Sequence, residues 1–173
     1  SGELNIWMNL QWTPFLWQAG GDELSPDRSA VAFDGPAAVK ALTLWKTLYE
    51  GEDFGKFGIA HDLGFASQKL AMILDGPWNL PRYRAMKDVD WRVAPLPAGP
   101  AGRATYIAGE QLAIFKQSVH QAEAWTFVKW ILGRDVQARF SMTSGYLPVR
   151  KSVLDLEAYQ ILLATNTAVK AFV

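Results

Sequence analysis

Short apolar runs that end in Gly- and Pro-rich turns alternate along this chain with longer segments of helical periodicity. Residues 70–74 form a compact apolar run before Asp75-Gly76-Pro77, and residues 90–96 alternate in polarity before a second turn. A third run covers residues 106–115 and is interrupted by Gly109. These segments have the length and the borders of strands. Because helical segments separate them, the sequence predicts an α/β fold.

The helical segments are marked by apolar stripes and by the residues at their ends. Residues 4–19 are apolar and aromatic nearly throughout and end at a Gly pair that suits a C-cap, with a break predicted near Pro14. Pro36 suits the first turn of a second helix. Ser118 and Gln121 form a capping-box pattern before a third stripe. Shorter helices are predicted at residues 65–69, 78–86, 135–142, 152–156 and 159–167, and a loop is predicted at residues 51–63.

Composition excludes several classes of protein. The 17 Lys and Arg residues balance 17 Asp and Glu residues without forming a basic block, so no nucleic-acid partner is predicted. Cysteine is absent, which excludes disulfides and thiol nucleophiles. The apolar runs are far shorter than the roughly 20 residues that cross a bilayer. Because the chain begins at Ser1 without a signal-peptide pattern, we expect a processed or trimmed fragment.

Patterns typical of catalysis or metal binding are weak. The two histidines, His61 and His120, have no second ligand at metal-binding spacing, and His120 fits a solvated helix start. His61-Asp62 is compatible with an acid/base pair, but adjacent loop residues are weak evidence. No nucleophile elbow, P-loop or dinucleotide motif is present. The sequence therefore predicts no enzyme, metal or cofactor, although two carboxylates that meet in space, as in a glycosidase, remain an open alternative.

Several segments, in order, resemble the family of bacterial extracellular solute-binding proteins that includes the maltose and glycerol-phosphate receptors. The main ones are residues 15–22, residues 65–78 with their Gly76-Pro77-Trp78 end, residues 94–97, and residues 145–152 with the sequence Gly-Tyr-Leu-Pro-Val-Arg-Lys-Ser. Residues 109–114 and 124–127 are also similar. The order and spacing of these segments over nearly the whole chain make the resemblance specific.

The resemblance implies a periplasmic-binding-protein-like (type II) fold, in which two α/β lobes close on a ligand around a hinge. Family members run to about twice this length, so we expect the first lobe to be largely absent. Residues 1–106 and 144–173 would form most of the second lobe, a small mixed sheet flanked by helices. Residues 107–143 would cross the hinge and contribute a strand and a helix to the first lobe.

That division leaves one helical stripe without its usual packing partner. The stripe consists of Ala124, Phe127, Val128 and Ile131. Because a contiguous exposed apolar surface favours association, we expect the isolated chain to self-associate, to pack this helix elsewhere, or to belong with another fragment.

The resemblance also implies ligand-binding residues. Trp78 is the strongest candidate, because an indole stacks on the C–H face of a pyranose while nearby polar groups bind its hydroxyls. Gly109 and Glu110 match a segment at the hinge, although many relatives carry a Gly pair where this chain has Ala108-Gly109. Glu110 can accept hydroxyl hydrogen bonds, or it can be a solvated hinge carboxylate.

Four more residues are candidates from their place in the matched segments. Tyr146 and Arg150 lie in the segment that lines the cleft in some relatives, and Arg150 would also suit a phosphate or carboxylate. Gln11 and Trp12 precede the first matched segment. The remaining tryptophans of the helical stripes are interpreted as packing residues: Trp17, Trp45, Trp125 and Trp130.

The implied function is that of a substrate-binding component, here a fragment, of an ABC importer. It would bind a sugar or oligosaccharide and deliver it to permease subunits in the membrane. The expected location is periplasmic or extracellular, with or without a lipoprotein anchor. The alternatives are a receptor for glycerol phosphate or another polyol, a carbohydrate-active enzyme domain, and a folding unit with no affinity of its own.

Overall fold

The computed structural model describes residues 6–51 and 61–173, with side chains from residue 11 to 51 and from residue 63 onward. The chain divides into two compact units. Unit 1 comprises Ser1–Leu74 and Pro95–Ala108, and unit 2 comprises Asp75–Ala94 and Gly109–Val173. These units describe packing within the chain, whereas the predicted division at residues 107–143 concerns the lobes of a whole receptor and stays a prediction.

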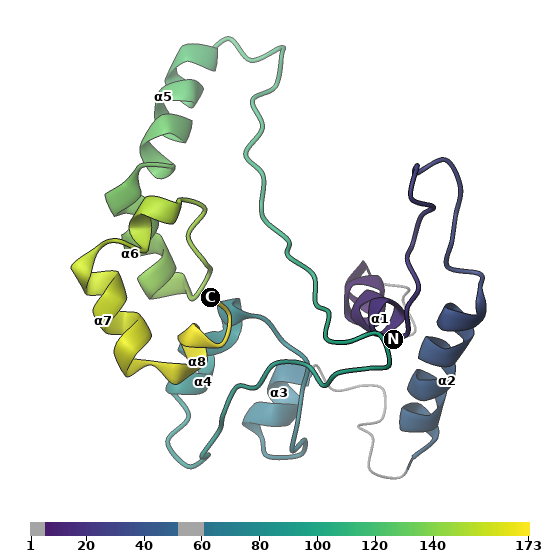
Figure 1. Ribbon diagram of the computed structural model, residues 1–173. Helices are drawn as coiled ribbons and strands as arrows, with labels where there is room; N and C mark the ends of the chain where they lie inside the picture. Colours follow the sequence, from purple (N-terminus) through teal and green to yellow (C-terminus); the bar gives the residue numbers. More distant parts are fainter. Residues whose placement is uncertain (1–5, 52–60) are drawn as a thin grey trace. The chain divides into compact units, whose positions relative to one another are not determined.

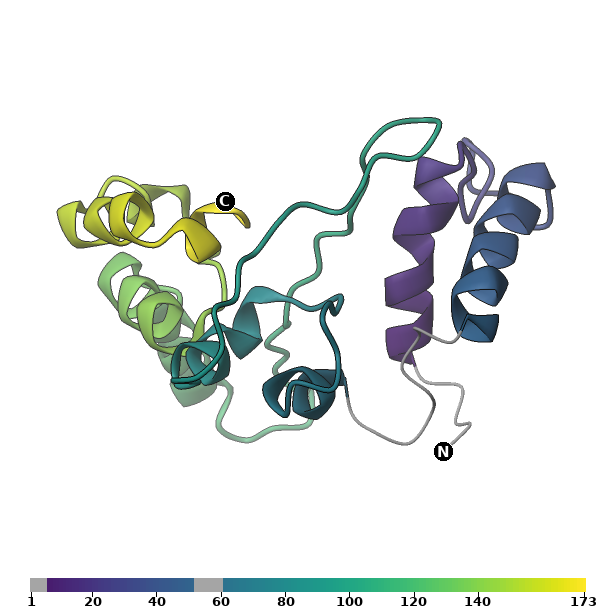
Figure 2. The same cartoon turned by 90° about the horizontal axis from the view of Figure 1, so that it is seen from below.

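Unit 1 is built on two long helices that lie side by side (Figures 1 and 2). They are α1 (Ile6–Gln18) and α2 (Pro36–Glu50), and a short helix α3 (His61–Ala66) follows. Leu16 of α1 and the small residues Ala38 and Ala41 of α2 are buried. The small alanine side chains let the two helices approach closely.

The two prolines of these helices have different outcomes. Pro36 begins α2, as predicted, because its missing N–H costs nothing in the first turn. The break predicted near Pro14 is wrong, because α1 continues through it. Pro14 is fully buried, and its apolar packing offsets the hydrogen bond that a proline removes from a helix.

A polar turn joins the paired residues Leu24 and Val31 of unit 1. The hydroxyls of Ser25 and Ser29 donate to the Asp27 carboxylate over 2.6 and 2.8 Å. These hydrogen bonds, the one from Ser25 above all, lower the pKa of Asp27 to about 2. The turn is therefore fixed by local side-chain contacts.

The predicted small mixed sheet is not formed. Across residues 6–51 and 61–173, backbone pairing is limited to two isolated antiparallel bridges, Leu24–Val31 and Gly99–Gly102. The apolar runs are exposed instead, with Met72 87% and Ile107 100% accessible. A strand needs a neighbouring strand to satisfy its N–H and C=O groups, and these segments have none among the described residues. The local pattern indicated strands but carried no information about their partners.

Unit 2 is a set of short helices around a small core. It contains, in chain order, η1 (Pro77–Asn79), α4 (Leu80–Arg84), α5 (Gln121–Ile131), α6 (Arg134–Ser144), η2 (Lys151–Val153), α7 (Glu157–Thr165) and α8 (Thr167–Lys170). Ala138, Val153 and Tyr159 form the buried centre, with leucines of α7 and of the preceding turn packed around them. Most of these helices were predicted, with ends within a few residues.

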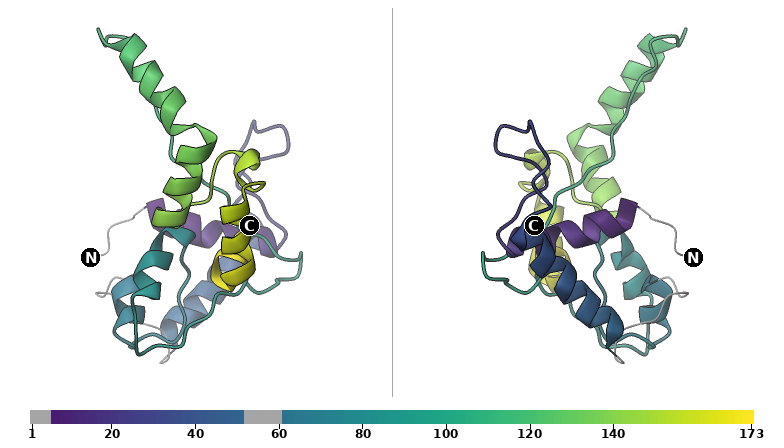
Figure 3. Two further views of the ribbon diagram at one scale, coloured as in Figure 1. Left: turned by 90° about the vertical axis from the view of Figure 1, so that its left-hand side faces the viewer. Right: turned by 90° about the vertical axis from the view of Figure 1, so that its right-hand side faces the viewer.

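Helix α5 extends from α6 away from the other helices of unit 2 (Figure 3). Its two tryptophans, Trp125 and Trp130, are 54% and 59% exposed, so the prediction that they are packing residues is wrong for the described structure. Phe127 is exposed as well. By contrast, the ring of Trp45 in unit 1 packs edge-on against the ring of Phe15, with 6.0 Å between the ring centroids, as expected for a packing residue. Helix α5 therefore presents an aromatic surface.

Candidate ligand-binding site

Trp78 lies in a tight turn whose geometry depends on a glycine. The turn is η1, and Gly76 precedes it in an extended conformation with φ −114°. The indole of Trp78 lies over the Gly76 backbone: a Cβ atom on Gly76 would be only 2.1 Å from the ring atoms Cη2 and Cζ3. Any larger residue at position 76 would therefore displace the indole.

Three aromatic rings form a row in unit 2. The ring centroids of Trp78 and Tyr146 are 6.0 Å apart, and those of Tyr146 and Phe140 are 5.9 Å apart. The interplanar angles of these pairs are 37° and 30°, within the range of favourable aromatic contacts. We call Trp78, Tyr146 and Phe140 the aromatic row. Trp78 and Tyr146 are half-buried and Phe140 is 44% exposed, so part of the row faces solvent.

The C-terminal end of α6 brings Tyr146 to Trp78. Gly145 ends the helix in the left-handed region at φ +84°, as a C-cap glycine does. A Cβ atom on Gly145 would lie 2.2 Å from the Pro77 carbonyl oxygen, so the cap fits against η1 only as glycine. The Ser141 hydroxyl donates to the Tyr146 carbonyl over 2.5 Å and fixes the chain beyond the cap.

The other predicted site residues of unit 2 lie outside the aromatic row. The Arg150 Nε–H donates to the Leu132 carbonyl, where α5 ends and its dipole favours a cation. Gly109 and Glu110 are exposed in an extended segment, and a Cβ atom on Gly109 would meet nothing within 4 Å. The structure thus brings together Trp78 and Tyr146, but not Gly109, Glu110 or Arg150.

Gln11 and Trp12 belong to α1 in unit 1. The Trp12 ring contacts Phe33 edge-on, with 6.4 Å between the centroids. Its Nε1 atom is buried and has no hydrogen-bond acceptor among the residues that the structure describes. A buried donor without an acceptor is uncommon in folded proteins. Among the two candidates on α1, only Trp12 has such a donor in the described residues.

The sequence analysis missed two residues in or beside the aromatic row. Phe140 was assigned only to a helix, and Asp75 was interpreted only as a turn residue. The place of Phe140 and Gly76 in the site depends on the contact between η1 and the end of α6, two segments that are distant in sequence. Nothing in either segment alone predicts that contact.

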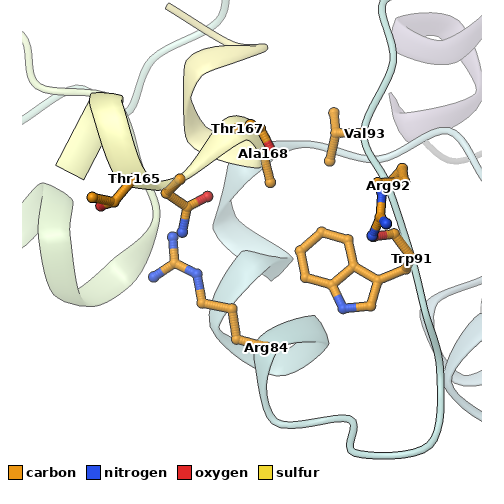
Figure 4. Close-up of a pocket in the computed structure, with 8 residues that line it drawn as sticks. Arg84, Trp91, Arg92, Val93, Thr165, Thr167 and Ala168 are labelled. Atoms are coloured by element: carbon orange, nitrogen blue, oxygen red, sulfur yellow. The ribbon is translucent and has the colours of Figure 1, made fainter.

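A hollow of about 260 Å³ lies elsewhere in unit 2 (Figure 4). Several of its polar groups already have partners: Thr165 donates to the Ile161 carbonyl, Asn166 accepts from the Val169 N–H, and Arg92 pairs with Asp90. Its lining consists of Arg84, Trp91, Arg92, Val93, Thr165, Asn166, Thr167 and Ala168. Because much of this polar lining is engaged, the aromatic row is the better candidate site.

The described part of the chain contains no group of three or more His, Cys, Asp or Glu residues that could hold a metal ion. The side chains of His61 and Asp62, the suggested acid/base pair, lie outside the described residues. Helices long and apolar enough to span a bilayer are also absent from residues 6–51 and 61–173.

Solved structures with the same fold define the class of this protein. The GacH receptor of Streptomyces glaucescens, solved unliganded and with acarbose, matches 92% of this chain with a TM-score of 0.81 and 28% identity. The cyclic alpha-maltosyl-1,6-maltose binding protein of Arthrobacter globiformis matches 95% with a TM-score of 0.73 and 29% identity. This chain covers 42% of each of those chains. The similarity confirms a periplasmic-binding-protein-like (type II) fold, and both of these similar proteins are ligand-binding proteins.

The family follows from the sequence match. The profile of the bacterial extracellular solute-binding proteins matches residues 4–170, and the chain belongs to this family. A binding protein of Brucella abortus (strain 2308) is 25% identical over 158 residues, which are 83% of this chain and 36% of that protein. The chain thus spans less than half the length of these relatives. The family and the similar structures are binding proteins and not enzymes, as the sequence predicted.

Proposed function

We propose that this chain carries most of the second ligand-binding lobe of an ABC-importer substrate-binding protein that holds a sugar or oligosaccharide between two lobes. The aromatic row carries the proposal, because partly exposed indole and phenol rings suit the apolar faces of pyranose rings. The names of the similar structures support a sugar: one receptor binds a cyclic maltosyl-maltose, and another was solved with acarbose. We refer to the whole protein as the intact receptor.

The remaining predicted residues would supply polar contacts in this proposal. Glu110 is exposed and can accept hydroxyl hydrogen bonds. Arg150 uses its Nε–H on the Leu132 carbonyl and has terminal N–H groups for sugar hydroxyls. The Nε1–H of Trp12, which has no acceptor among the described residues, would donate to a ligand or to another part of the receptor. Gln11 and Gly109 stay proposed contacts from their own segments.

The proposed partners are permease subunits in the membrane, and the proposed location is the periplasm or the cell exterior, with or without a lipid anchor. The description of the family as extracellular supports this location. An isolated second lobe offers only part of an interlobe cleft, so the 173-residue chain alone should bind ligand weakly or not at all.

Calorimetry with a panel of ligands tests the sugar assignment. We expect the intact receptor to release binding heat with maltose-type oligosaccharides and not with glycerol phosphate or glycerophosphocholine. The phosphorylated set is included because an arginine at position 150 also suits a phosphate. If only the phosphorylated ligands release heat, the protein is a polyol-phosphate receptor and the sugar assignment is wrong. If the intact protein hydrolyses a glycoside, it is an enzyme and the receptor assignment is wrong.

We also propose that residues 107–143 cross the hinge and that the first lobe covers the aromatic surface of α5. Without that lobe, Trp125 and Trp130 remain exposed, and exposed aromatic surface favours association. We therefore expect the 173-residue chain to form concentration-dependent dimers in analytical ultracentrifugation, and Trp125→Glu with Trp130→Glu to abolish them. A compact monomer of the unsubstituted chain at all concentrations contradicts this proposal.

A further inference from the structure

Asp75 precedes the turn that carries Trp78 and accepts hydrogen bonds from groups on both sides of it. Its Oδ1 atom accepts the Gly76 N–H over 2.8 Å. Its Oδ2 atom accepts from the side-chain amide of Asn79 over 2.8 Å and from the Tyr83 hydroxyl. One carboxylate therefore joins the start of η1, the end of η1 and helix α4.

Tyr83 gives this network a fixed base. It is buried, and its ring contacts Trp91 with 5.8 Å between the centroids. Burial, and then the hydrogen bond to Asp75, raise the pKa of the Tyr83 hydroxyl well above its usual range. The hydroxyl is therefore protonated at neutral pH and donates to Asp75. The carboxylate is held between a buried donor and the turn.

Two constraints thus act on the Trp78 indole from different directions. Asp75 fixes the backbone of the turn through Gly76 and Asn79. Gly76 leaves the space that the indole occupies, because a Cβ atom there would lie 2.1 Å from the ring. A side chain whose position is fixed before binding loses less entropy when a ligand stacks on it.

We propose that Asp75 is a positioning residue that holds the Trp78 ring beside Tyr146, ready to stack on a ligand. The proposal rests on the proposed function of the aromatic row. Asp75 acts through the turn and does not itself contact the ligand. In Asp75→Asn, a donor amide in place of Oδ2 can accept from neither the Asn79 amide nor the Tyr83 hydroxyl, so the network loses its charge and both of these hydrogen bonds.

A double-mutant cycle in the intact receptor tests the proposal. With a maltose-type oligosaccharide as the probe, we expect Asp75→Asn to weaken binding about tenfold in the otherwise unchanged receptor. The same substitution should cause no further loss when Trp78 is already Ala, because residues that act through each other are not additive. An equal loss in both backgrounds overturns the proposal.

A spectroscopic measurement without ligand separates this proposal from the assignment of the site. The indole ¹⁵N–H resonance of Trp78 is identified by its absence in Trp78→Ala. Asp75→Asn should shift and broaden it, and an unchanged resonance overturns the positioning role. A shifted resonance together with wild-type affinity of Trp78→Ala supports positioning by Asp75 and contradicts the sugar-binding role of the row.

Two further variants complete the experiment. Gly76→Ala displaces the indole directly while its extended backbone stays allowed, and it should weaken binding at least as much as Asp75→Asn. Asp88→Asn removes an exposed carboxylate of the same unit and should change neither the resonance nor the affinity. Gly76→Ala with wild-type affinity, or an effect of Asp88→Asn equal to that of Asp75→Asn, contradicts the proposal.

Discussion

Trp78→Ala is expected to weaken sugar binding by the intact receptor about 30-fold or more, which corresponds to about 2 kcal/mol. The indole is the half-buried end of the aromatic row. It offers a large rigid face on which a ligand can stack with little loss of side-chain entropy, and Trp78→Ala removes that face. Trp78→Phe keeps a smaller aromatic face and should lose less. Isothermal calorimetry with the best ligand of the panel measures both variants.

Trp17→Ala is the matched control for this loss. Trp17 is also a half-buried indole, but it belongs to α1 of unit 1, where its Nε1–H donates to the Asp22 carboxylate over 3.1 Å. Its removal should lower stability through lost packing and leave affinity within about twofold. Folded Trp78→Ala receptor with unchanged affinity contradicts the proposed role of the row, and so does an equal affinity loss in Trp17→Ala.

The helices of this chain were predictable because their signals are local. Pro36 at the start of α2 and Gly145 at the end of α6 act through backbone geometry alone, which is the same in every context. The capping box at Ser118 was less reliable. The Ser118 hydroxyl accepts the His120 N–H, whereas the Gln121 side chain donates to the Lys116 carbonyl. A helix thus forms at the predicted place with different end contacts.

The sheet was not predictable because a strand is defined by a partner. The run at residues 70–74 is apolar enough for a buried strand, yet Met72 is exposed in the described structure. An apolar run indicates that burial would be favourable, but it does not say which segment provides the opposite face. The pattern supported an α/β class, and the similar solved structures, not a local sheet, confirmed the fold.

The candidate site was predictable only in part for the same reason. The resemblance named Trp78 and Tyr146 separately, and the structure places their rings in contact. Phe140 and Asp75 were missed because their roles arise from contacts between segments that are distant in sequence. Arg150, by contrast, contacts the end of α5, a structural partner that no motif indicated. The chemistry of a side chain can be predicted from the sequence, but the residues that it contacts in the folded chain cannot.

Gly145→Ala is expected to destabilise the intact receptor by about 2 to 5 kcal/mol. At φ +84° an L residue is strained, and the new Cβ atom would meet the Pro77 carbonyl oxygen at 2.2 Å, so the strain adds to a backbone clash. Two other glycines separate backbone strain from the clash. Gly102 has φ +108° and nothing near a Cβ atom, so Gly102→Ala should show the effect of strain alone. Gly35 has φ −88° and open space, so Gly35→Ala should change stability by less than about 1 kcal/mol.

Chemical denaturation followed by circular dichroism measures the three variants, and calorimetry shows whether sugar affinity follows. The clash can be relieved only if the end of α6 moves away from η1, and that movement would separate Tyr146 from Trp78. Gly145→Ala should therefore weaken sugar binding as well, whereas Gly102→Ala should affect stability alone. If Gly145→Ala is no more destabilising than Gly102→Ala, the α6 cap and η1 are not in close contact. The explanation for the contact between Tyr146 and Trp78 then fails as well.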